Sequence, residues 1–368
     1  MKKIRPHLVP PLFICLLLAG LSLTPFQGQE HFVNERKKIL KELKVWMEKK
    51  YPDKCKPLYL NRTIPLESAS KSPEILFKGV TTLSWSTSGH LILPDSILNF
   101  IYIMDRHGNI TRKVGKPGQG PGELMQPVKA FSGDGLLQVL ELGNMRIQSF
   151  DENGNHLNSF RLFRFYTSME RTNDGLFFGA PAFHQTSTGL VDLLTDKGEL
   201  LATFGDCLNY SSDNKNFNLD NSIVISVSDA GDLWVAFKHY PIIRRYSKRG
   251  ELLTEFHIDH PIMNRQAAAN RKGEVLLTNQ RAQARIIVIN AIRSFENNIY
   301  ILRTHPCLEI MALDLNGNIS AIYYWSEDLS YSSLDFLLRR EGERIEFYVL
   351  NLESQKIDIF NHLREISS

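Results

Sequence analysis

The sequence has few cysteines and no paired cysteine motif. Its 368 residues include 4 Cys: Cys15 lies in an N-terminal apolar run, and Cys55, Cys207 and Cys307 are far apart in the rest of the chain. Without a C-x-x-C pair, the chain lacks the usual motif of a zinc site or a dithiol redox centre. The three later cysteines allow either one disulfide with a leftover thiol or three small buried hydrophobic residues.

The sequence also lacks an excess of either charge. Its 43 Lys and Arg residues face 40 Asp and Glu residues, and both signs are spread along the chain, for a formal net charge of +3. A protein that binds nucleic acid needs a basic patch or stripe to neutralise phosphates. We therefore expect no nucleic-acid partner.

Long apolar runs are missing except near the N-terminus. There, Lys2, Lys3 and Arg5 precede the apolar run 12–23. This layout is typical of a secretory signal peptide, which we assign to residues 1–29, and the run is short for a membrane-spanning helix. A poor cleavage site leaves an uncleaved membrane anchor as the alternative. We expect an exported protein that is periplasmic, at the cell surface or secreted, with membrane contact only if the segment is uncleaved.

One short phrase recurs through the chain: an apolar run, then Asp or Ser, then Gly, a polar residue and another apolar run. Its copies are DRHGNI (105–110), DENGNHL (151–157), DKGEL (196–200), SKRGEL (247–252) and DLNGNI (314–319). Each copy predicts a tight β-hairpin, because Asp or Ser can bond the turn backbone and Gly can adopt a positive φ. The hairpin glycines lie 46, 44, 52 and 67 residues apart.

A second phrase, a polar turn followed by an apolar strand, occurs six times. Its copies are SGHLIL (88–93), DGLLQV (134–139), DGLFF (174–178), GDLWV (231–235), NNIYIL (297–302) and GERIEFYV (342–349). Forty-odd residues for each four-stranded unit indicates a β-propeller, which we prefer to a β-sandwich because a sandwich would not repeat one hairpin at a near-constant interval. The fold we predict is all-β, a six-bladed β-propeller.

The predicted domain covers residues 55–368. Its blades are expected at about 79–114, 126–161, 166–205, 219–258, 286–324 and 331–362. The long intervals come from residues 206–218 and 259–285, which we interpret as loop excursions. The sixth unit lacks the hairpin, so its outer strand should come from Leu58–Leu60 and Ile64, which would close the ring. Within an N-terminal extension, residues 30–54, the apolar spacing over 31–50 predicts a short amphipathic helix outside the ring.

The repeat brings out a family resemblance. The phrase GKPGQGPGELMQP (115–127) resembles the inter-blade loop of NHL-repeat-like six-bladed β-propellers in exported bacterial proteins, and residues 144–151, NMRIQSFD, are similarly NHL-like. The resemblance implies a bacterial source and this fold, but it carries no activity. The glycines of this phrase lack the spacing of a phosphate-binding loop and lead into a strand, so we interpret them as a structural turn.

Candidate functional residues lie in the loops that should gather at one mouth of the central channel. Asp95, Glu141, His184, His239 and His305 could ligate a divalent metal, since imidazole and carboxylate are suitable ligands. The alternative is that these are unrelated loop residues, several of them beside prolines. Lys238, Tyr240 and Arg303 are candidate ligand-binding residues, and their positive charges would suit an anionic partner.

Two functions follow from these observations. The first is a non-catalytic binding module, expected to be monomeric, that holds a protein, peptide or glycan and needs no cofactor. The second is a metal-dependent enzyme of the lactonase or lyase type, with the five metal-ligand candidates at the channel mouth, and it rests on the resemblance to related six-bladed folds that are lactonases or lyases. No Ser/His/Asp or Cys/His nucleophile motif is recognisable.

Overall fold

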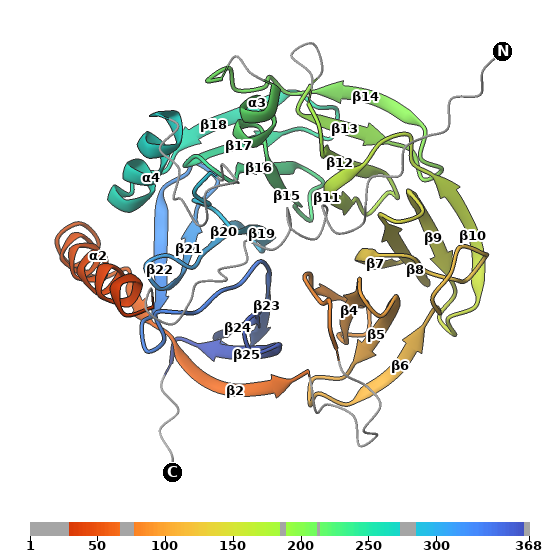
Figure 1. The fold of residues 1–368 in the computed structure, drawn as a ribbon, viewed down its shortest axis with the longest axis horizontal. Helices are drawn as coiled ribbons and strands as arrows, with labels where there is room; N and C mark the ends of the chain where they lie inside the picture. The colour runs from red at the N-terminus through yellow and green to blue at the C-terminus, as the bar shows by residue number, and fades with distance from the viewer. Residues whose placement is uncertain (1–28, 67–76, 185–188, 212–213, 273–284, 364–368) are drawn as a thin grey trace.

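The computed structural model describes residues 29–66, 77–184, 189–211, 214–272 and 285–363. Their strands form six sheets arranged as a ring around a central axis (Figure 1). The protein is a six-bladed β-propeller, as predicted. The expected signal segment, apart from its last residue, lies outside the described residues.

The first three blades are antiparallel sheets whose strands run in order from the channel to the rim. Blade 1 contains β3 (Ser84–Trp85), β4 (Leu91–Asp95), β5 (Phe100–Met104) and β6 (Ile110–Val114). Blade 2 contains β7 (Pro127–Gly133), β8 (Leu136–Glu141), β9 (Arg146–Phe150) and β10 (His156–Arg161). Blade 3 contains β11 (Tyr166–Arg171), β12 (Phe177–Pro181), β13 (Val191–Leu194) and β14 (Leu200–Phe204).

Blades 4 and 5 follow the same order. Blade 4 contains β15 (Ile223–Val227), β16 (Leu233–Phe237), β17 (Ile242–Tyr246) and β18 (Leu252–His257). Blade 5 contains β19 (Ala291–Phe295), β20 (Asn298–Arg303), β21 (Leu308–Leu313) and β22 (Ile319–Trp325). A fifth strand, β1 (Cys55–Pro57), pairs in parallel with β22 on the rim side, which the sequence did not indicate.

Blade 6 closes the ring with a strand from the other end of the chain. It contains β23 (Phe336–Glu341), β24 (Arg344–Asn351), β25 (Lys356–Asn361) and, outermost, β2 (Tyr59–Pro65). β2 pairs antiparallel with β25, with Ile64 opposite Ile357. The expectation that residues 58–64 complete the last blade is confirmed.

The repeated hairpin glycines explain how neighbouring blades fit together. Each sits under an apolar side chain from the outer strand of the blade before it: Gly108 under Ile64, Gly154 under Val114, Gly198 under Phe160, Gly250 under Phe204 and Gly317 under Phe256. At Gly198, φ is +80° and a Cβ atom would lie 2.5 Å from the Phe160 ring. Both the turn and the blade contact therefore require glycine there.

Inner strands are also joined by partly buried ion pairs. Lys129 of β7 lies 3.0 Å from Glu170 of β11, and Arg293 of β19 lies 3.7 Å from the same carboxylate. Blades 2, 3 and 5 thus meet through one glutamate beside the channel.

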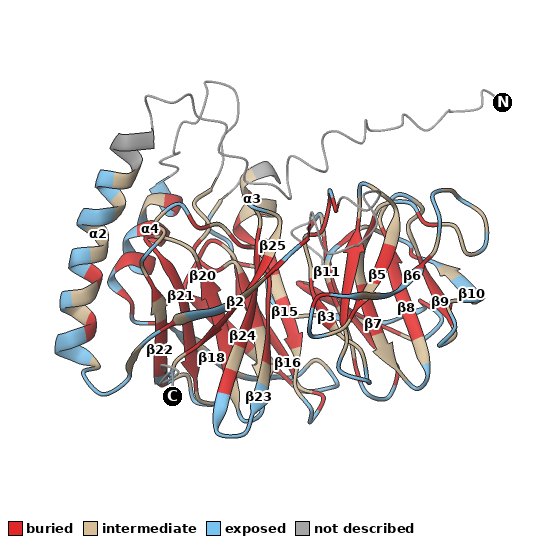
Figure 2. Ribbon diagram, turned by 90° about the horizontal axis from the view of Figure 1, so that it is seen from below, coloured by how far each residue is buried: buried red, intermediate tan, exposed pale blue. Residues whose placement is uncertain are grey.

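Within the described residues, three helices lie outside the sheets. α2 (Gln29–Lys50) packs on the outside of the ring through Leu43 and Met47, as the apolar spacing predicted (Figures 1 and 2). The prediction of plain loop excursions at 206–218 and 259–285 was wrong, because α3 (Asn214–Asp220) and α4 (Pro261–Lys272) form there. None of the described helices is long and apolar enough to cross a bilayer.

No disulfide joins Cys55, Cys207 and Cys307 in this structure. Cys307 is fully buried, and the other two are half-buried. Burial raises the pKa of Cys307 to about 12, so its thiol is protonated at neutral pH.

Candidate functional site

The candidate residues lie at strand ends or in loops on one face of the ring, which we call the mouth face. Because the strands alternate in direction, the loop after each second strand and the connection after each outer strand emerge on the same side. α3 and α4 belong to these connections and lie on this face (Figure 2). The topology therefore places all eight candidate residues at one end of the propeller.

Asp95 shapes its own loop. Its buried carboxylate accepts hydrogen bonds from the backbone N–H groups of Ile97 and Leu98, at 3.0 and 2.8 Å, and of Lys78 at 2.9 Å. These donors occupy the oxygen atoms that a metal would need. The structure gives Asp95 a turn-forming role.

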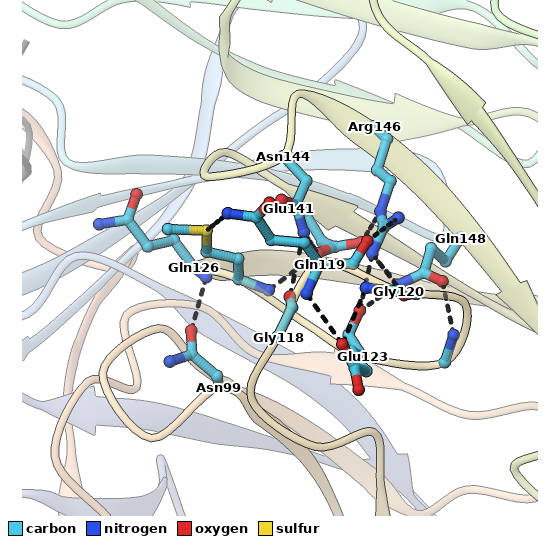
Figure 3. A network of polar contacts seen from close by, with 12 residues as sticks. Asn99, Gly118, Gln119, Gly120, Glu123, Gln126, Glu141, Asn144, Arg146 and Gln148 are labelled. Carbon is cyan, nitrogen blue, oxygen red and sulfur yellow. Dashed lines mark hydrogen bonds and ion pairs between the residues drawn. The ribbon is translucent and has the colours of Figure 1, made fainter. Parts of the chain in front are cut away.

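Glu141 has the same kind of role in blade 2 (Figure 3). Its buried carboxylate accepts from the Met125 backbone N–H at 2.8 Å, from Arg146 Nε at 2.7 Å, and from the side-chain amides of Asn144 and Gln148. Arg146 in turn donates to the carbonyls of the glycine-rich loop. Residues 115–127 and 144–151 thus meet around one buried carboxylate.

The glycine-rich loop is closed on itself. Glu123 Oε2 accepts from the backbone N–H groups of Gln119 and Gly120, at 3.0 and 2.8 Å, and these bonds lower the pKa of Glu123 (Figure 3). The loop's own glutamate fills the position that a phosphate would take. The interpretation as a structural turn is confirmed.

His239 and His305 are both held neutral. His239 is buried, and its Nδ1 lies 3.0 Å from the Ile286 carbonyl oxygen; burial lowers its pKa to about 4. Burial, aided by the positive charges of Arg36 and Arg303, lowers the pKa of the half-buried His305 to about 3. Among the described residues, no group of three or more His, Cys, Asp or Glu side chains is placed to hold a metal ion. The structure does not bring the five metal-ligand candidates together.

Arg303 belongs to a buried polar cluster that holds α4 against blade 5. It donates to the Val288 carbonyl at 3.0 Å and to Gln266 Oε1 at 3.1 Å, and it lies 3.3 Å from Glu309 Oε2. His260 Nδ1 accepts from the first N–H groups of α4, which leaves its Nε2 facing Glu309 Oε1 at 3.2 Å. These contacts occupy the Arg303 side chain.

Tyr240 and Lys238 differ in accessibility. Tyr240 is buried and donates to Asp220 Oδ1 at 2.5 Å. Lys238 is half-buried, and burial lowers the pKa of its amine. Lys238 is the least buried of the three ligand-binding candidates.

In four of the blades, a polar residue on the third strand holds the chain segment that leads into the first strand of that blade. These residues occupy one register position, opposite Val139, Gly179, Val235 and Val349; they are Gln148, Asp192, Arg244 and Asp358. Asp192, for example, accepts from Tyr166 Oη at 2.8 Å, and Asp358 accepts from Tyr331 Oη at 3.1 Å. Sequence reasoning missed this repeat because its members differ in type.

At blade 3 this anchor positions an exposed aromatic pair. Asp192 Oδ2 lies 3.2 Å from Arg164 Nε, and the Arg164 guanidinium lies 4.7 Å from the centre of the Phe163 ring. A backbone hydrogen bond from Ala182 to Phe165, at 2.9 Å, brings this segment beside the loop that carries Phe183. Phe163 and Phe183 are 49% and 66% exposed. Two large rings on adjacent segments thus face solvent beside a held arginine.

His184 lies next to this pair and is 5% exposed. Its backbone N–H is held by Asn218 of α3, and both ring nitrogens are buried. Burial lowers the pKa of His184, with the nearby backbone of Gly189 and Asn221 acting in the opposite direction. We call Phe163, Arg164, Phe183 and His184 the blade 3 rim site.

Residues 47–242, more than half of the chain, match a family described as a 6-bladed beta-propeller. The chain belongs to this family. No curated protein matches this chain significantly.

Solved structures resemble this member of the six-bladed β-propeller family. A Bacteroides fragilis NCTC 9343 protein, provisionally described as exported, shares 12% identity with a TM-score of 0.54, over 84% of this chain and 96% of that one. A streptogramin B lyase structure shares 15% identity, with a TM-score of 0.50 over 83% and 97%. The WD40 propeller domain of Doa1 shares 10% identity, with a TM-score of 0.51 over 86% and 95%. At these identities the likeness is one of fold.

The six-bladed propeller family accounts for the scaffold but not for the rim site. Of the four residues of the blade 3 rim site, the sequence analysis identified His184, because it follows the second strand of its blade. Phe163, Arg164 and Phe183 lie outside every repeated phrase. A usable signal was their composition, since two phenylalanines in predicted surface loops are unusual.

Proposed function

We propose that this propeller is a non-catalytic binding module that holds a polypeptide partner at the blade 3 rim site. The observation that carries the proposal is the exposure of Phe163 and Phe183 on two adjacent segments. Large aromatic side chains bury much apolar area when a partner covers them, and they dominate many protein interfaces. A rigid ring that presents such a pair is suited to binding.

Further exposed apolar side chains lie elsewhere on the mouth face. They are Ile97, Met125 and Tyr210, which emerge from blade 1, from the connection into blade 2 and from the connection into blade 4. Aliphatic and aromatic groups together favour a polypeptide over a glycan, because sugars are bound mainly through hydrogen bonds and single ring faces.

Arg164 would supply a polar contact at the site. The Arg164 side chain is partly exposed and its orientation is fixed by Asp192. Lys238, on the neighbouring blade 4, is a further candidate contact.

We place this activity outside the cytoplasm, on the strength of the signal-like residues 1–29, and expect the protein to act as a monomer. No contact among the described residues favours the lactonase- or lyase-type alternative. Binding is therefore the function that we carry forward.

The proposal is tested with a random peptide display library selected on the immobilised full chain. Affinities of enriched peptides are then measured by fluorescence anisotropy for the wild type and for the Phe163→Ser/Phe183→Ser variant. Loss of two interface aromatics should weaken binding about tenfold or more.

The matched control is Leu252→Ser/Leu253→Ser, which removes an exposed apolar pair from the rim of blade 4. It should leave the affinities within about twofold of the wild type. Equal losses in both variants, or no enriched peptide, would contradict the proposal. A parallel glycan array covers the other class of ligand, and sugar binding that depends on the two phenylalanines, without peptide binding, would overturn the polypeptide assignment.

A further inference from the structure

The outward side of α2 carries a stripe of lysines. Helical spacing places Lys37, Lys38, Lys41, Val45 and Lys49 on one side, and all five are exposed. The opposite side, with Leu43 and Met47, is buried against the propeller. The helix is thus fixed in a rotation that turns these lysines away from the ring.

Two acidic residues of the helix lie to one side of the stripe. Glu42 lies on the flank of α2 and pairs with Arg265 of α4 at 3.1 Å. By the same helical spacing, Glu35 is on that flank, and between Lys37 and Lys49 the stripe includes one carboxylate, Glu48. The stripe therefore has an excess of positive charge, although the whole chain is nearly balanced.

The sequence in front of the helix gives this charge a context. The apolar run 12–23 ends six residues before α2 begins at Gln29. An uncleaved run of this kind would hold α2 at a bilayer surface. A lysine close to an anionic bilayer contributes about 1 kcal/mol of attraction, and this attraction fades within a Debye length of roughly 10 Å at 0.1 M salt.

We propose that the lysine stripe of α2 docks on a bilayer surface that contains anionic phospholipid. The occupant is the lipid surface, because its charge complements the stripe and the apolar run provides the tether. α2 lies outside the ring beside blade 5, whereas the rim site lies on blade 3 (Figure 1). The docked propeller would keep the rim site open to solution, and this inference does not depend on the proposed function.

The experiment measures how fast individual lysines react with a water-soluble amine reagent, by mass spectrometry. The full chain is reconstituted in vesicles of phosphatidylcholine, with or without phosphatidylglycerol. We expect Lys37, Lys38, Lys41 and Lys49 to react about fivefold more slowly in the anionic vesicles at low salt, and this protection to disappear at about 0.5 M salt. Lys197 and Lys248, exposed on hairpins away from α2, should react equally in both.

Two double variants separate the stripe from total charge. Lys38→Glu/Lys41→Glu should abolish the protection of Lys37 and Lys49, while Lys197→Glu/Lys248→Glu, with the same change in net charge, should leave it intact. Equal reactivity in the two lipids would overturn the proposal, even if the protein stays with the vesicles through its apolar run. Equal effects of the two variants would also overturn it, since they would show a response to bulk charge alone.

Discussion

At the scale of single residues, a hairpin glycine is required both for the positive φ of its turn and for the close contact with the neighbouring blade. Substitutions can separate these two requirements. Gly198 and Gly89 have nearly the same φ, +80° and +76°, but a Cβ atom on Gly198 would meet the Phe160 ring at 2.5 Å, whereas one on Gly89 would meet nothing within 4 Å. Gly89→Ala should lower the free energy of unfolding by about 1 kcal/mol, the cost of the backbone conformation. Gly198→Ala should add overpacking and lower it by about 2–4 kcal/mol.

Urea unfolding of both glycine variants measures this difference. Equal losses would show that the turn conformation alone requires glycine and that the contact between blades is easily adjusted. The comparison therefore tests whether the repeat spaces the blades as well as turning the chain.

The candidate site was only partly predictable from the sequence, because the repeat places residues along the chain but does not orient their side chains. The repeat indicated where each second strand ends: Asp95 and Glu141 are the last residues of β4 and β8, and His184 follows β12. It gave no direction for the side chains, and Asp95 turns back to accept hydrogen bonds from its own loop. Phe163 and Arg164 were missed because their exposure depends on how blades 2 and 3 pack.

At the scale of elements, α4 shows why a helix was mistaken for a loop. Its buried side has helical spacing, but it includes the polar Gln266 and Asn270. Gln266 accepts from Arg303, and Asn270 donates to the carbonyls of His239 and Ile286 at 2.9 Å each. A sequence pattern cannot show that polar residues are buried when their partners lie on other elements.

The packing of α4, in the connection between blades 4 and 5, should weaken in acid because of His239. Burial lowers the pKa of folded His239 to about 4, whereas an unfolded histidine titrates near 6.5. Below about pH 6.5 His239 therefore becomes protonated in the unfolded chain but stays neutral in the folded chain. The free energy of unfolding falls progressively toward pH 4. At pH 5 this histidine alone should lower the free energy of unfolding by about 1–2 kcal/mol relative to pH 7.5.

The pH effect is measured by urea unfolding of wild type and His239→Asn at the two pH values. The asparagine amide can still donate to the Ile286 carbonyl but does not titrate, so the variant should lose about 1–2 kcal/mol less on acidification. His107→Asn, at an exposed hairpin, is the control and should reproduce the wild-type loss. An acid loss unchanged in His239→Asn would show that other groups carry it.

At the scale of the whole molecule, the fold was predictable because the hairpin and strand phrases recur at a near-constant spacing and because a ring of blades has to close. Five hairpins for six strand phrases implied a missing outer strand, and β2 supplies it. The fifth strand of blade 5 was not predictable in the same way. β1 has only three residues, and nothing in a three-residue segment specifies a parallel partner.

Ring closure by β2 makes this junction the place where the propeller should open first. Only noncovalent contacts join β2 to β25, and Ile64, which is 2% exposed, also covers Gly108 of blade 1. Ile64→Asp would bury a charge at both contacts and should cost about 3–5 kcal/mol, whereas Leu60→Asp, on the same strand but 42% exposed, should cost less than about 1 kcal/mol. Hydrogen exchange should become faster in β25 of Ile64→Asp while β12 of blade 3 stays protected. Equal acceleration in both strands would instead mean that the ring unfolds as one unit, with no weak junction at β2.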